Sequence, residues 1–385
     1  MPRIHLSMPH MSGHEMPFIQ AAFAENWVVP LGPDVDAFEI DLQNYLSHDD
    51  PSREHIRVAA LSAGTAAIHL GLILAGVKPG DEVICQDFTF AASANPITYL
   101  GAKPVFVDSE PHTWNMDPEL LEQAISDRVA VTGRRPAAIV PVHLYGMPAM
   151  MDRIMEIATR WEIPVVEDAA EALGSTYRGH ACGTFGHYGV LSFNGNKMIT
   201  TSGGGALICP DDASRRQAIF YATQARDPLP YYHHTRIGYN YRLSNISAAI
   251  GRGQMMVLRD HIVHRQGLAA LYGNLLTDIP GIAVHTAPSL EFEPNYWLTT
   301  ITIDPEQTGG LTPEQVRQHL ASLGIETRLL WRPMHMQPVF ADAPAYTNGV
   351  SERLFATGLC LPSGPSVSHD DAREVIDSIT SLIRR

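Results

Sequence analysis

Lys197 stands in a segment whose residue types fit covalent carbonyl chemistry beside a phosphate. Ser192 lies five residues before it, and residues 203–205, shortly after it, are all glycine. A lysine amine can form a Schiff base with a carbonyl carbon, and a serine hydroxyl or free backbone N–H groups can bind phosphate oxygens. The other two lysines, Lys78 and Lys103, each precede a proline in turn-like settings typical of exposed loops. Lys197 is therefore the candidate nucleophile.

Further segments could complete such a site. Residues 62–67 fall at a predicted strand-to-helix turn, where the amides of Thr65 and Ala66 could bind phosphate at the positive end of a helix dipole. Asp168 ends an apolar run, a costly place for a carboxylate unless a cation such as a protonated pyridine nitrogen meets it. With Phe90 expected on the same rim, these features together describe a pyridoxal phosphate site.

Each feature taken alone has a plainer interpretation. Small residues at a turn can simply pack, Asp168 could cap the next helix or pair with an arginine, and Lys197 could be a solvated loop lysine. The combination is what favours the cofactor site.

The elements that would position these residues alternate along the chain. From about residue 57, short apolar runs alternate with amphipathic stretches, which predicts βαβ units on a mostly parallel sheet. Ligands gather beyond the carboxyl ends of such strands, so residues 64–66, residues 88–90, His143 and Asp168 should share one rim. The expected fold is therefore α/β, with a large sheet and the site along one edge of it.

A second, smaller unit is predicted after the large one. The pattern predicts one continuous helix over 243–276 that links the two units, and then a strand and helices that form an α+β unit. Ser368 and Asp371 predict the N-cap of the last helix. We expect a large domain over 1–258, with an N-terminal arm, and a small C-terminal domain over 259–385.

Composition narrows the class of protein. The formal net charge of −14 argues against nucleic acid or an anionic membrane as a partner. No apolar run could span a bilayer, and the first residues lack a signal-peptide pattern, so we expect a cytoplasmic location. The four cysteines have no CxxC spacing, so neither a disulfide framework nor a metal site is expected.

Several motifs carry a resemblance that covers nearly the whole chain. Residues 62–66, 166–174, 192–197 and 238–245 resemble those of the DegT/DnrJ/EryC1/StrS family of sugar aminotransferases. The resemblance implies the pyridoxal phosphate-dependent transferase fold of aspartate aminotransferase, known as fold type I. A second set of segments is similar to the branch that makes UDP-linked 4-amino sugars, including the precursor of N-acetylbacillosamine: residues 7–13, 191–197, 222–226 and 326–335.

The resemblance implies roles for individual residues. Lys197 matches the Schiff-base lysine, Asp168 the partner of the pyridine nitrogen, and Phe90 the aromatic stacked on the ring. Glu171 stands where many relatives have Gln or His near the ring hydroxyl. Asn240 fits a residue that reaches the phosphate from the neighbouring subunit, which implies a homodimer with shared active sites. The phosphate ligands within the chain match Thr65, Ala66 and Ser192.

The same resemblance implies two substrates, L-glutamate as amino donor and a UDP-linked 4-keto-6-deoxy-N-acetylhexosamine as acceptor. Arg328, Arg332 and His335 could bind the diphosphate, with Trp297 as a stacking surface. The alternative is that Trp297 belongs to the core and the arginines form surface ion pairs.

Other functions fit less well. A GDP-4-keto-6-deoxymannose 4-aminotransferase, or GDP-perosamine synthase, would share the fold, the cofactor and the 4-keto chemistry. A dehydratase of this fold usually has histidine in place of the lysine. A pyridoxal phosphate-binding regulator would need a DNA-binding module, which the pattern does not indicate, and a nicotinamide-dependent oxidoreductase would need a GxGxxG motif after an early strand.

Overall fold

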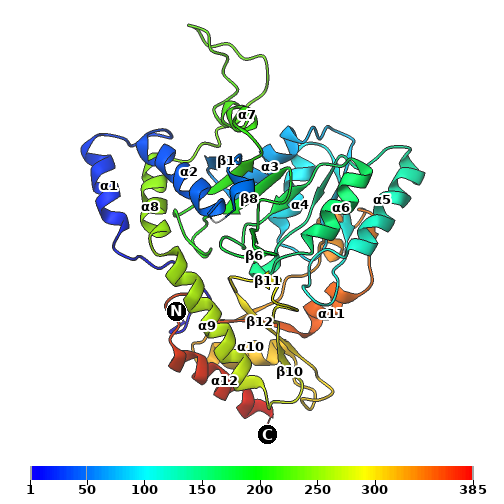
Figure 1. Ribbon diagram of the computed structural model, residues 1–385. Coiled ribbons are helices and arrows are strands. Elements are labelled where there is room, and N and C mark those ends of the chain that lie inside the picture. Colours follow the sequence, from blue (N-terminus) through cyan, green and yellow to red (C-terminus); the bar gives the residue numbers. More distant parts are fainter. Residues whose placement is uncertain (1, 49, 384–385) are drawn as a thin grey trace.

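One large sheet forms the upper part of the molecule (Figure 1). The computed structural model describes residues 2–48 and 50–383. Two four-stranded groups are joined by parallel bridges, Ile139–Val165 and Val142–Asp168. All neighbouring strands pair in parallel except β9, which is antiparallel to both β8 and β1. In spatial order the strands are β14 (Ala345–Tyr346), β3 (Lys103–Val107), β2 (Glu82–Gln86), β4 (Ala138–Val140), β5 (Val166–Asp168), β8 (Tyr188–Ser192), β9 (Gly205–Cys209) and β1 (Arg57–Leu61).

Because helices cover this sheet, its strands consist of nearly continuous runs of apolar residues. Gly71 lets helix α3 lie close to the sheet, because a Cβ there would lie 3.0 Å from Cγ1 of Val166. That close packing sets the first turn of α3 beside the strand ends. The helices of this part of the chain are α2 (Pro33–Leu46), α3 (Gly64–Leu74), α4 (Ala91–Tyr99), α5 (Pro118–Thr132), α6 (Met151–Trp161) and α7 (Asp212–Ala222).

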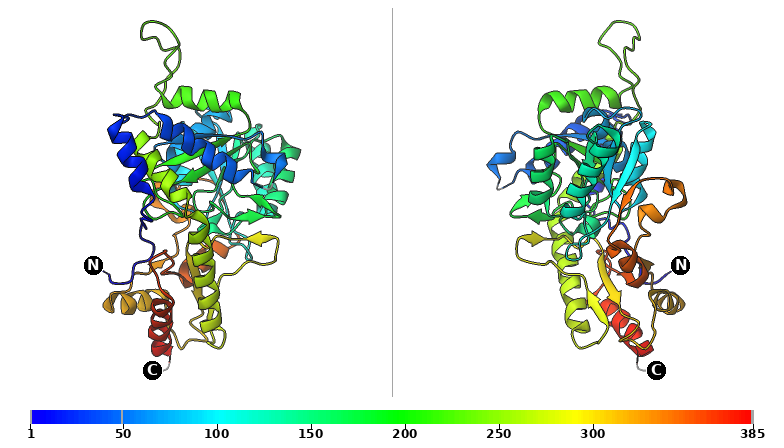
Figure 2. Two further views of the ribbon diagram at one scale, coloured as in Figure 1. Left: turned by 60° about the vertical axis from the view of Figure 1, so that its left-hand side comes forward. Right: turned by 90° about the vertical axis from the view of Figure 1, so that its right-hand side faces the viewer.

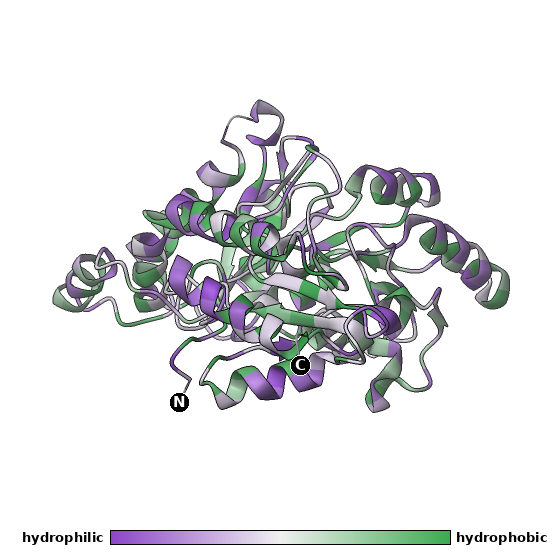
Figure 3. Cartoon of the chain, turned by 90° about the horizontal axis from the view of Figure 1, so that it is seen from below, coloured by the Kyte–Doolittle hydropathy of each residue, from purple (hydrophilic) through white to green (hydrophobic). Residues whose placement is uncertain are grey.

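A smaller antiparallel sheet lies below the large one, in the order β10 (Ile282–Val284), β12 (Thr299–Ile303), β15 (Gly358–Leu361) and β13 (Arg328–Leu329). Helices α10 (Pro313–Ser322) and α12 (His369–Ile383) pack around it. Figure 3 shows the molecule from this end, with hydrophilic and hydrophobic residues mixed along its helices. Ser368 caps α12 as predicted: its hydroxyl accepts from the N–H of Asp371 at 3.0 Å. The prediction of a large, mostly parallel sheet with a smaller α+β unit is confirmed.

The prediction of one continuous helix over 243–276 is wrong. Helix α8 (Asn245–Met255) ends just before Val257, which leaves helical geometry with φ −117° and ψ 6°, and α9 (Leu258–Leu276) begins in a new direction. The chain turns because α8 packs against α1 (Glu15–Ala24) and α2, whereas α9 runs down to the small sheet (Figure 1). Apolar periodicity continues through the break, so the sequence pattern does not reveal it.

The N-terminal segment descends from α1 to the small unit (Figure 2). Ile4 forms a parallel bridge with Ile325, and the N–H of Glu326 donates to the carbonyl of Ile4 at 2.9 Å. The Ser7 hydroxyl donates to the carbonyl of Asn196 at 3.0 Å. This arm therefore ties the small unit to the segment that carries Lys197.

The C-terminal part also returns to the large sheet, through β14 and helix α11 (Val350–Thr357). The limits at residues 258 and 259 stay a prediction. A three-stranded ribbon of β11 (Phe292–Glu293), β6 (Thr176–Tyr177) and β7 (His180–Ala181) lies between the two units. Within the described ranges, no helix has the length and apolar character needed to cross a membrane.

Candidate active site

A cavity of about 510 Å³ opens at the carboxyl ends of the large sheet's strands, with further walls from the small unit. Ala66 follows Thr65 in α3 and is buried beside the cavity. Asn240, Arg332 and His335 do not line it. Eight of the residues predicted from the sequence do: Thr65, Phe90, Asp168, Glu171, Ser192, Lys197, Trp297 and Arg328.

Lys197 is a sheltered amine inside this cavity. Its Nζ donates to Oε1 of Glu171 at 3.0 Å and lies 4.1 Å from the centre of the Trp297 ring. The Trp297 indole N–H in turn donates to the carbonyl of Asn196 at 2.7 Å, which fixes the ring next to the lysine. Only 12% of the Lys197 side chain is exposed. The interpretation of Lys197 as a solvated loop residue is therefore excluded.

Glu171, the hydrogen-bond acceptor of this amine, is itself held in place by the backbone. Its Oε2 accepts the backbone N–H of Tyr145 at 2.8 Å, and Tyr145 has a φ of 54°, in the left-handed region. Burial raises the pKa of Glu171, whereas the charge of Lys197 and its hydrogen bond act to lower it. Glu171 thus contacts the lysine directly, and its predicted contact with the cofactor hydroxyl stays a prediction.

Asp168 is a buried carboxylate at the end of β5. It accepts the hydroxyl of Ser93 at 2.7 Å and the backbone N–H of Ala170 at 3.1 Å. Burial raises its pKa, and it forms no salt bridge within residues 2–48 and 50–383. An arginine pair, one of the two plainer interpretations, is therefore absent from that part of the chain. The other, a helix cap, does not apply either, because β6 and not a helix follows β5. The charges of Lys197 and His143 offset this burial only in part, and a protonated pyridine nitrogen would supply a cation in direct contact.

The first turn of α3 forms a cup. A Cβ on Gly64 would lie 3.1 Å from Cβ of Ser192, and a Cβ on Gly205 would overlap the carbonyl carbon of Ala63 and the nitrogen of Gly64. Only glycine therefore lets the start of β9 reach this turn. The free N–H groups of the helix start and the Ser192 hydroxyl lie together, which suits a phosphate. The cup, the amine and the buried carboxylate share one cavity and fit pyridoxal phosphate.

Aromatic rings line the outer part of the cavity. Phe90 precedes α4 and is 56% exposed, and its predicted stacking on the cofactor ring stays a prediction. The Trp331 ring lies 5.5 Å from that of Phe90 and 4.9 Å from that of Tyr145. Sequence reasoning missed Trp331, Tyr145 and Ser93. Of these three, only Ser93 could have been found from the sequence, because it carries a hydroxyl about one helical turn after Phe90.

Two of the predicted residues lie at the surface. Asn240 is exposed and forms an antiparallel bridge with Thr223, the residue that follows α7. Its contact with a neighbouring subunit stays a prediction. Arg332 is also exposed, and its carbonyl accepts from Nε2 of Gln337 at 3.1 Å.

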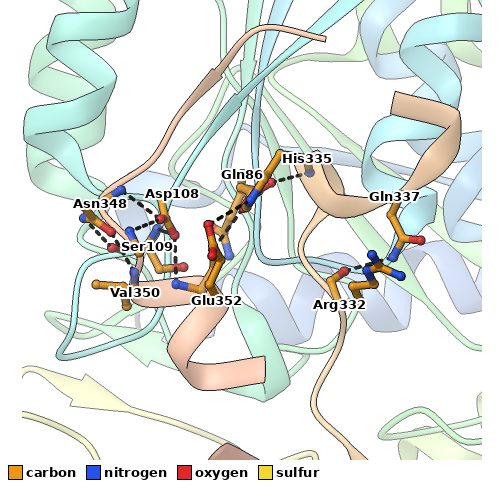
Figure 4. Close-up of polar contacts among 12 residues, drawn as sticks. Gln86, Asp108, Ser109, Arg332, His335, Gln337, Asn348, Val350 and Glu352 are labelled. Carbon is orange, nitrogen blue, oxygen red and sulfur yellow. Dashed lines mark hydrogen bonds and ion pairs between the residues drawn. The ribbon is translucent and has the colours of Figure 1, made fainter. Parts of the chain in front are cut away.

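His335 connects the large sheet to α11 (Figure 4). Its Nδ1 lies 2.7 Å from Oδ2 of Asp87, a buried residue just after β2, and its Nε2 lies 3.3 Å from Oε1 of Glu352. The backbone N–H of His335 also donates to Asp87, at 2.8 Å. Both ring nitrogens are engaged by carboxylates, so this geometry does not support His335 as a ligand of a diphosphate.

We expect His335→Gln to destabilise the fold by about 1 kcal/mol near pH 6, and less at pH 8.5. The hydrogen bond to Asp87 raises the pKa of His335. Its contribution is therefore fully present below the unfolded value of about 6.5 and is lost as pH rises through the folded pKa. Urea unfolding at both pH values measures this, with the exposed His55→Gln as control. An equal loss at both pH values would contradict the charged pair.

Comparisons with known proteins agree with this geometry. A sequence model of the DegT/DnrJ/EryC1/StrS aminotransferase family matches residues 9–380. EpsN of Bacillus subtilis, whose name describes a pyridoxal phosphate-dependent aminotransferase, is 46% identical over 99% of this chain and 96% of its own. GDP-perosamine synthase of Caulobacter vibrioides is 34% identical over 100% and 99%. A solved DegT DnrJ EryC1 StrS aminotransferase from Brucella abortus has a TM-score of 0.88 and 30% identity, covering 97% and 96%.

Proposed function

Because the chain belongs to the DegT/DnrJ/EryC1/StrS aminotransferase family, we propose that it transfers an amino group from L-glutamate to C4 of a UDP-linked 4-keto-6-deoxy-N-acetylhexosamine. One observation carries the transfer chemistry: the amine of Lys197 is held between Glu171 and Trp297, in the same cavity as the buried Asp168. The predicted family, the predicted fold type I and the predicted cofactor, pyridoxal phosphate, are confirmed by the match to the family and by its relatives.

The residues of the cavity divide the work of binding and proton movement. Bound pyridoxal phosphate supplies an electron-accepting ring for the carbon that loses its proton. Asp168 would hold the ring nitrogen, and Ser192 with the amides of Thr65 and Ala66 would hold the phosphate. Lys197 would take the proton from the α-carbon of glutamate through Nζ and, in the second half of the reaction, deliver one to C4 of the sugar.

The amino acid and the sugar would use one cavity in turn. L-Glutamate would leave as 2-oxoglutarate before the sugar nucleotide enters. Arg328 lines the cavity with its side chain 69% exposed, and it pairs with Glu326 at 3.2 Å. To bind a diphosphate it would have to share or exchange this surface ion pair. We place the reaction in the cytoplasm and in a homodimer, in which Asn240 of one subunit would complete the site of the other.

The second candidate substrate is GDP-4-keto-6-deoxymannose. The similarity to the Caulobacter GDP-perosamine synthase favours it, whereas the segments at residues 191–197 and 326–335 favour the UDP-linked sugar. A pyridoxal phosphate-binding regulator could use the same lysine amine to hold the cofactor, so formation of the amino sugar is what distinguishes an enzyme from it.

Parallel assays of the purified protein test this proposal. We expect 2-oxoglutarate and a UDP-linked 4-amino sugar, identified by mass spectrometry, when L-glutamate and the UDP-linked 4-keto sugar are both present. Formation of the amino sugar only from the GDP-linked substrate would move the assignment to the second candidate. Neither product at any cofactor concentration would overturn the proposed function.

A further inference from the structure

Two hydrogen bonds converge on the peptide that carries Lys197. The carbonyl of Asn196, the residue before the lysine, accepts the hydroxyl of Ser7 at 3.0 Å and the indole N–H of Trp297 at 2.7 Å. A carbonyl oxygen has two lone pairs, so these two donors use its full capacity. One donor belongs to the N-terminal arm and the other to the segment that leads into β12. Both the arm and the small unit therefore hold the backbone of the lysine.

Arg265, on α9, connects these two donors to each other. Its Nη1 donates to the carbonyl of Trp297 at 2.7 Å and to that of Ser363 at 2.9 Å, and its Nη2 donates to Oγ of Ser7 at 3.3 Å. The Ser7 hydroxyl thus accepts from Arg265 while it donates to Asn196. These hydrogen bonds close a ring, here called the lysine clamp, of four residues: Ser7, Asn196, Arg265 and Trp297.

The guanidinium of Arg265 is buried without a counter-ion. The residue is 1% exposed, burial lowers its pKa to about 9, and no carboxylate pairs with it in the part of the chain that the structure describes. A buried cation that meets only neutral oxygens costs free energy. A planar guanidinium can nevertheless donate to several acceptors in fixed directions, whereas an ammonium group is a compact point charge without this geometry. The position therefore suits a residue that aligns several segments at once.

The clamp borders the cavity. Asn196, Lys197 and Trp297 line it, and so does Leu6, the neighbour of Ser7 in the arm. The rate of a reaction at a side-chain amine depends on its placement, and a misplacement of about 1 Å can cost about 100-fold. A shift of the arm or of the small unit would move the peptide from which the lysine side chain extends.

We propose that Ser7 and Arg265 are positioning residues, which hold the peptide between Asn196 and Lys197 so that the lysine amine meets pyridoxal phosphate in the cavity. Neither residue lines the cavity, so both act through Asn196 and Trp297. This inference rests on the proposed function only in its use of the cofactor and of Lys197. It is independent of which sugar nucleotide and which amino donor the protein uses.

The rate at which Lys197 becomes covalently linked to pyridoxal phosphate tests the inference without either substrate. The full-length protein, freed of cofactor, is mixed with saturating pyridoxal phosphate, samples are quenched with borohydride over time, and the labelled peptide is quantified by mass spectrometry. Ser7→Ala removes one of the two donors to Asn196, so we expect linkage about 10-fold slower than in the wild type. The final amount of label should be the same, because the phosphate cup and Asp168 are unchanged. Ser7→Thr, which keeps the hydroxyl, should behave as the wild type does.

Ser47→Ala is the matched control. Ser47 is also partly buried, and its hydroxyl donates to the carbonyl of Gln43 at 2.9 Å, outside the lining of the cavity. We expect this variant to lower the melting temperature about as much as Ser7→Ala does, because each loses one hydrogen bond, but to leave the linkage rate unchanged. Arg265→Met should slow linkage at least as much as Ser7→Ala, and Ser7→Ala decides alone if that variant does not fold.

The outcomes separate this inference from the proposed function. An unchanged linkage rate in Ser7→Ala would overturn the role of the clamp, and so would an equal slowing in Ser7→Thr or in Ser47→Ala. The proposed function survives these results as long as Lys197 carries the label. Slower linkage in Ser7→Ala alone, together with failure of both sugar assays, would support the clamp while the substrate assignment fails. No label on Lys197 in the wild type would overturn both.

Discussion

Lys197→Ala is expected to lower transamination by on the order of 10³-fold or more while leaving the cofactor bound without a covalent link. The substitution removes the amine that would move protons, but it leaves Ser192, the α3 turn and Asp168 in place. Lys197→Arg should fail equally, because a guanidinium stays protonated and cannot take a proton from carbon. Turnover from both substrates measures the loss, and equilibrium dialysis measures the retained binding.

Borohydride reduction followed by peptide mass spectrometry gives a readout that is independent of turnover. In the wild type the cofactor mass should appear on the peptide that contains Lys197, and in Lys197→Ala on no peptide. Lys78→Ala, at an exposed lysine, serves as the matched control and should behave as the wild type does. Turnover that survives in Lys197→Ala, or a label on Lys78, would refute the assignment.

The sequence was sufficient for the parts of the site that local pattern determines. Thr65, Asp168 and Ser192 all stand at the ends of strands or the start of a helix, and parallel strands bring such ends to one edge. Lys197 differs from the other lysines through its immediate neighbours. For these residues, element type and position along the element decide where the side chain lies.

The remaining features depend on contacts between distant segments. Trp331 reaches the cavity because Tyr145 and Asp87 fix its loop, and neither residue carries a signal that points to it. His335 looks like a phosphate ligand in sequence, beside two arginines, but two carboxylates from other elements engage it. The break between α8 and α9 likewise follows from the different partners of the two helices rather than from their residues.

Asp168→Asn is expected to have opposite effects on activity and on the stability of the cofactor-free protein. We expect turnover to fall by on the order of 10²- to 10⁴-fold, because a neutral amide no longer favours a protonated ring nitrogen. The amide has nearly the same shape, so it can still accept the N–H of Ala170 and meet the hydroxyl of Ser93. Ser93→Ala, which keeps the charge, should cost far less activity.

The stability effect follows from the sign of the pKa shift. Burial raises the pKa of Asp168 in the cofactor-free fold, so its ionisation is disfavoured in the folded state relative to the unfolded one. The contribution of Asp168 is therefore fully present below the unfolded value of about 3.9 and is lost as pH rises through the folded pKa. The ionised carboxylate opposes folding, because the charges of Lys197 and His143 offset its burial only in part. Asp168→Asn should therefore leave the cofactor-free protein as stable as the wild type or more so. The rise in melting temperature on adding pyridoxal phosphate should then be smaller in the variant than in the wild type, because the ligand no longer neutralises a buried charge.

Thermal unfolding with and without cofactor measures both effects. A variant that is less stable without cofactor, yet stabilised by it as much as the wild type is, would show that Asp168 serves the fold rather than the ring nitrogen.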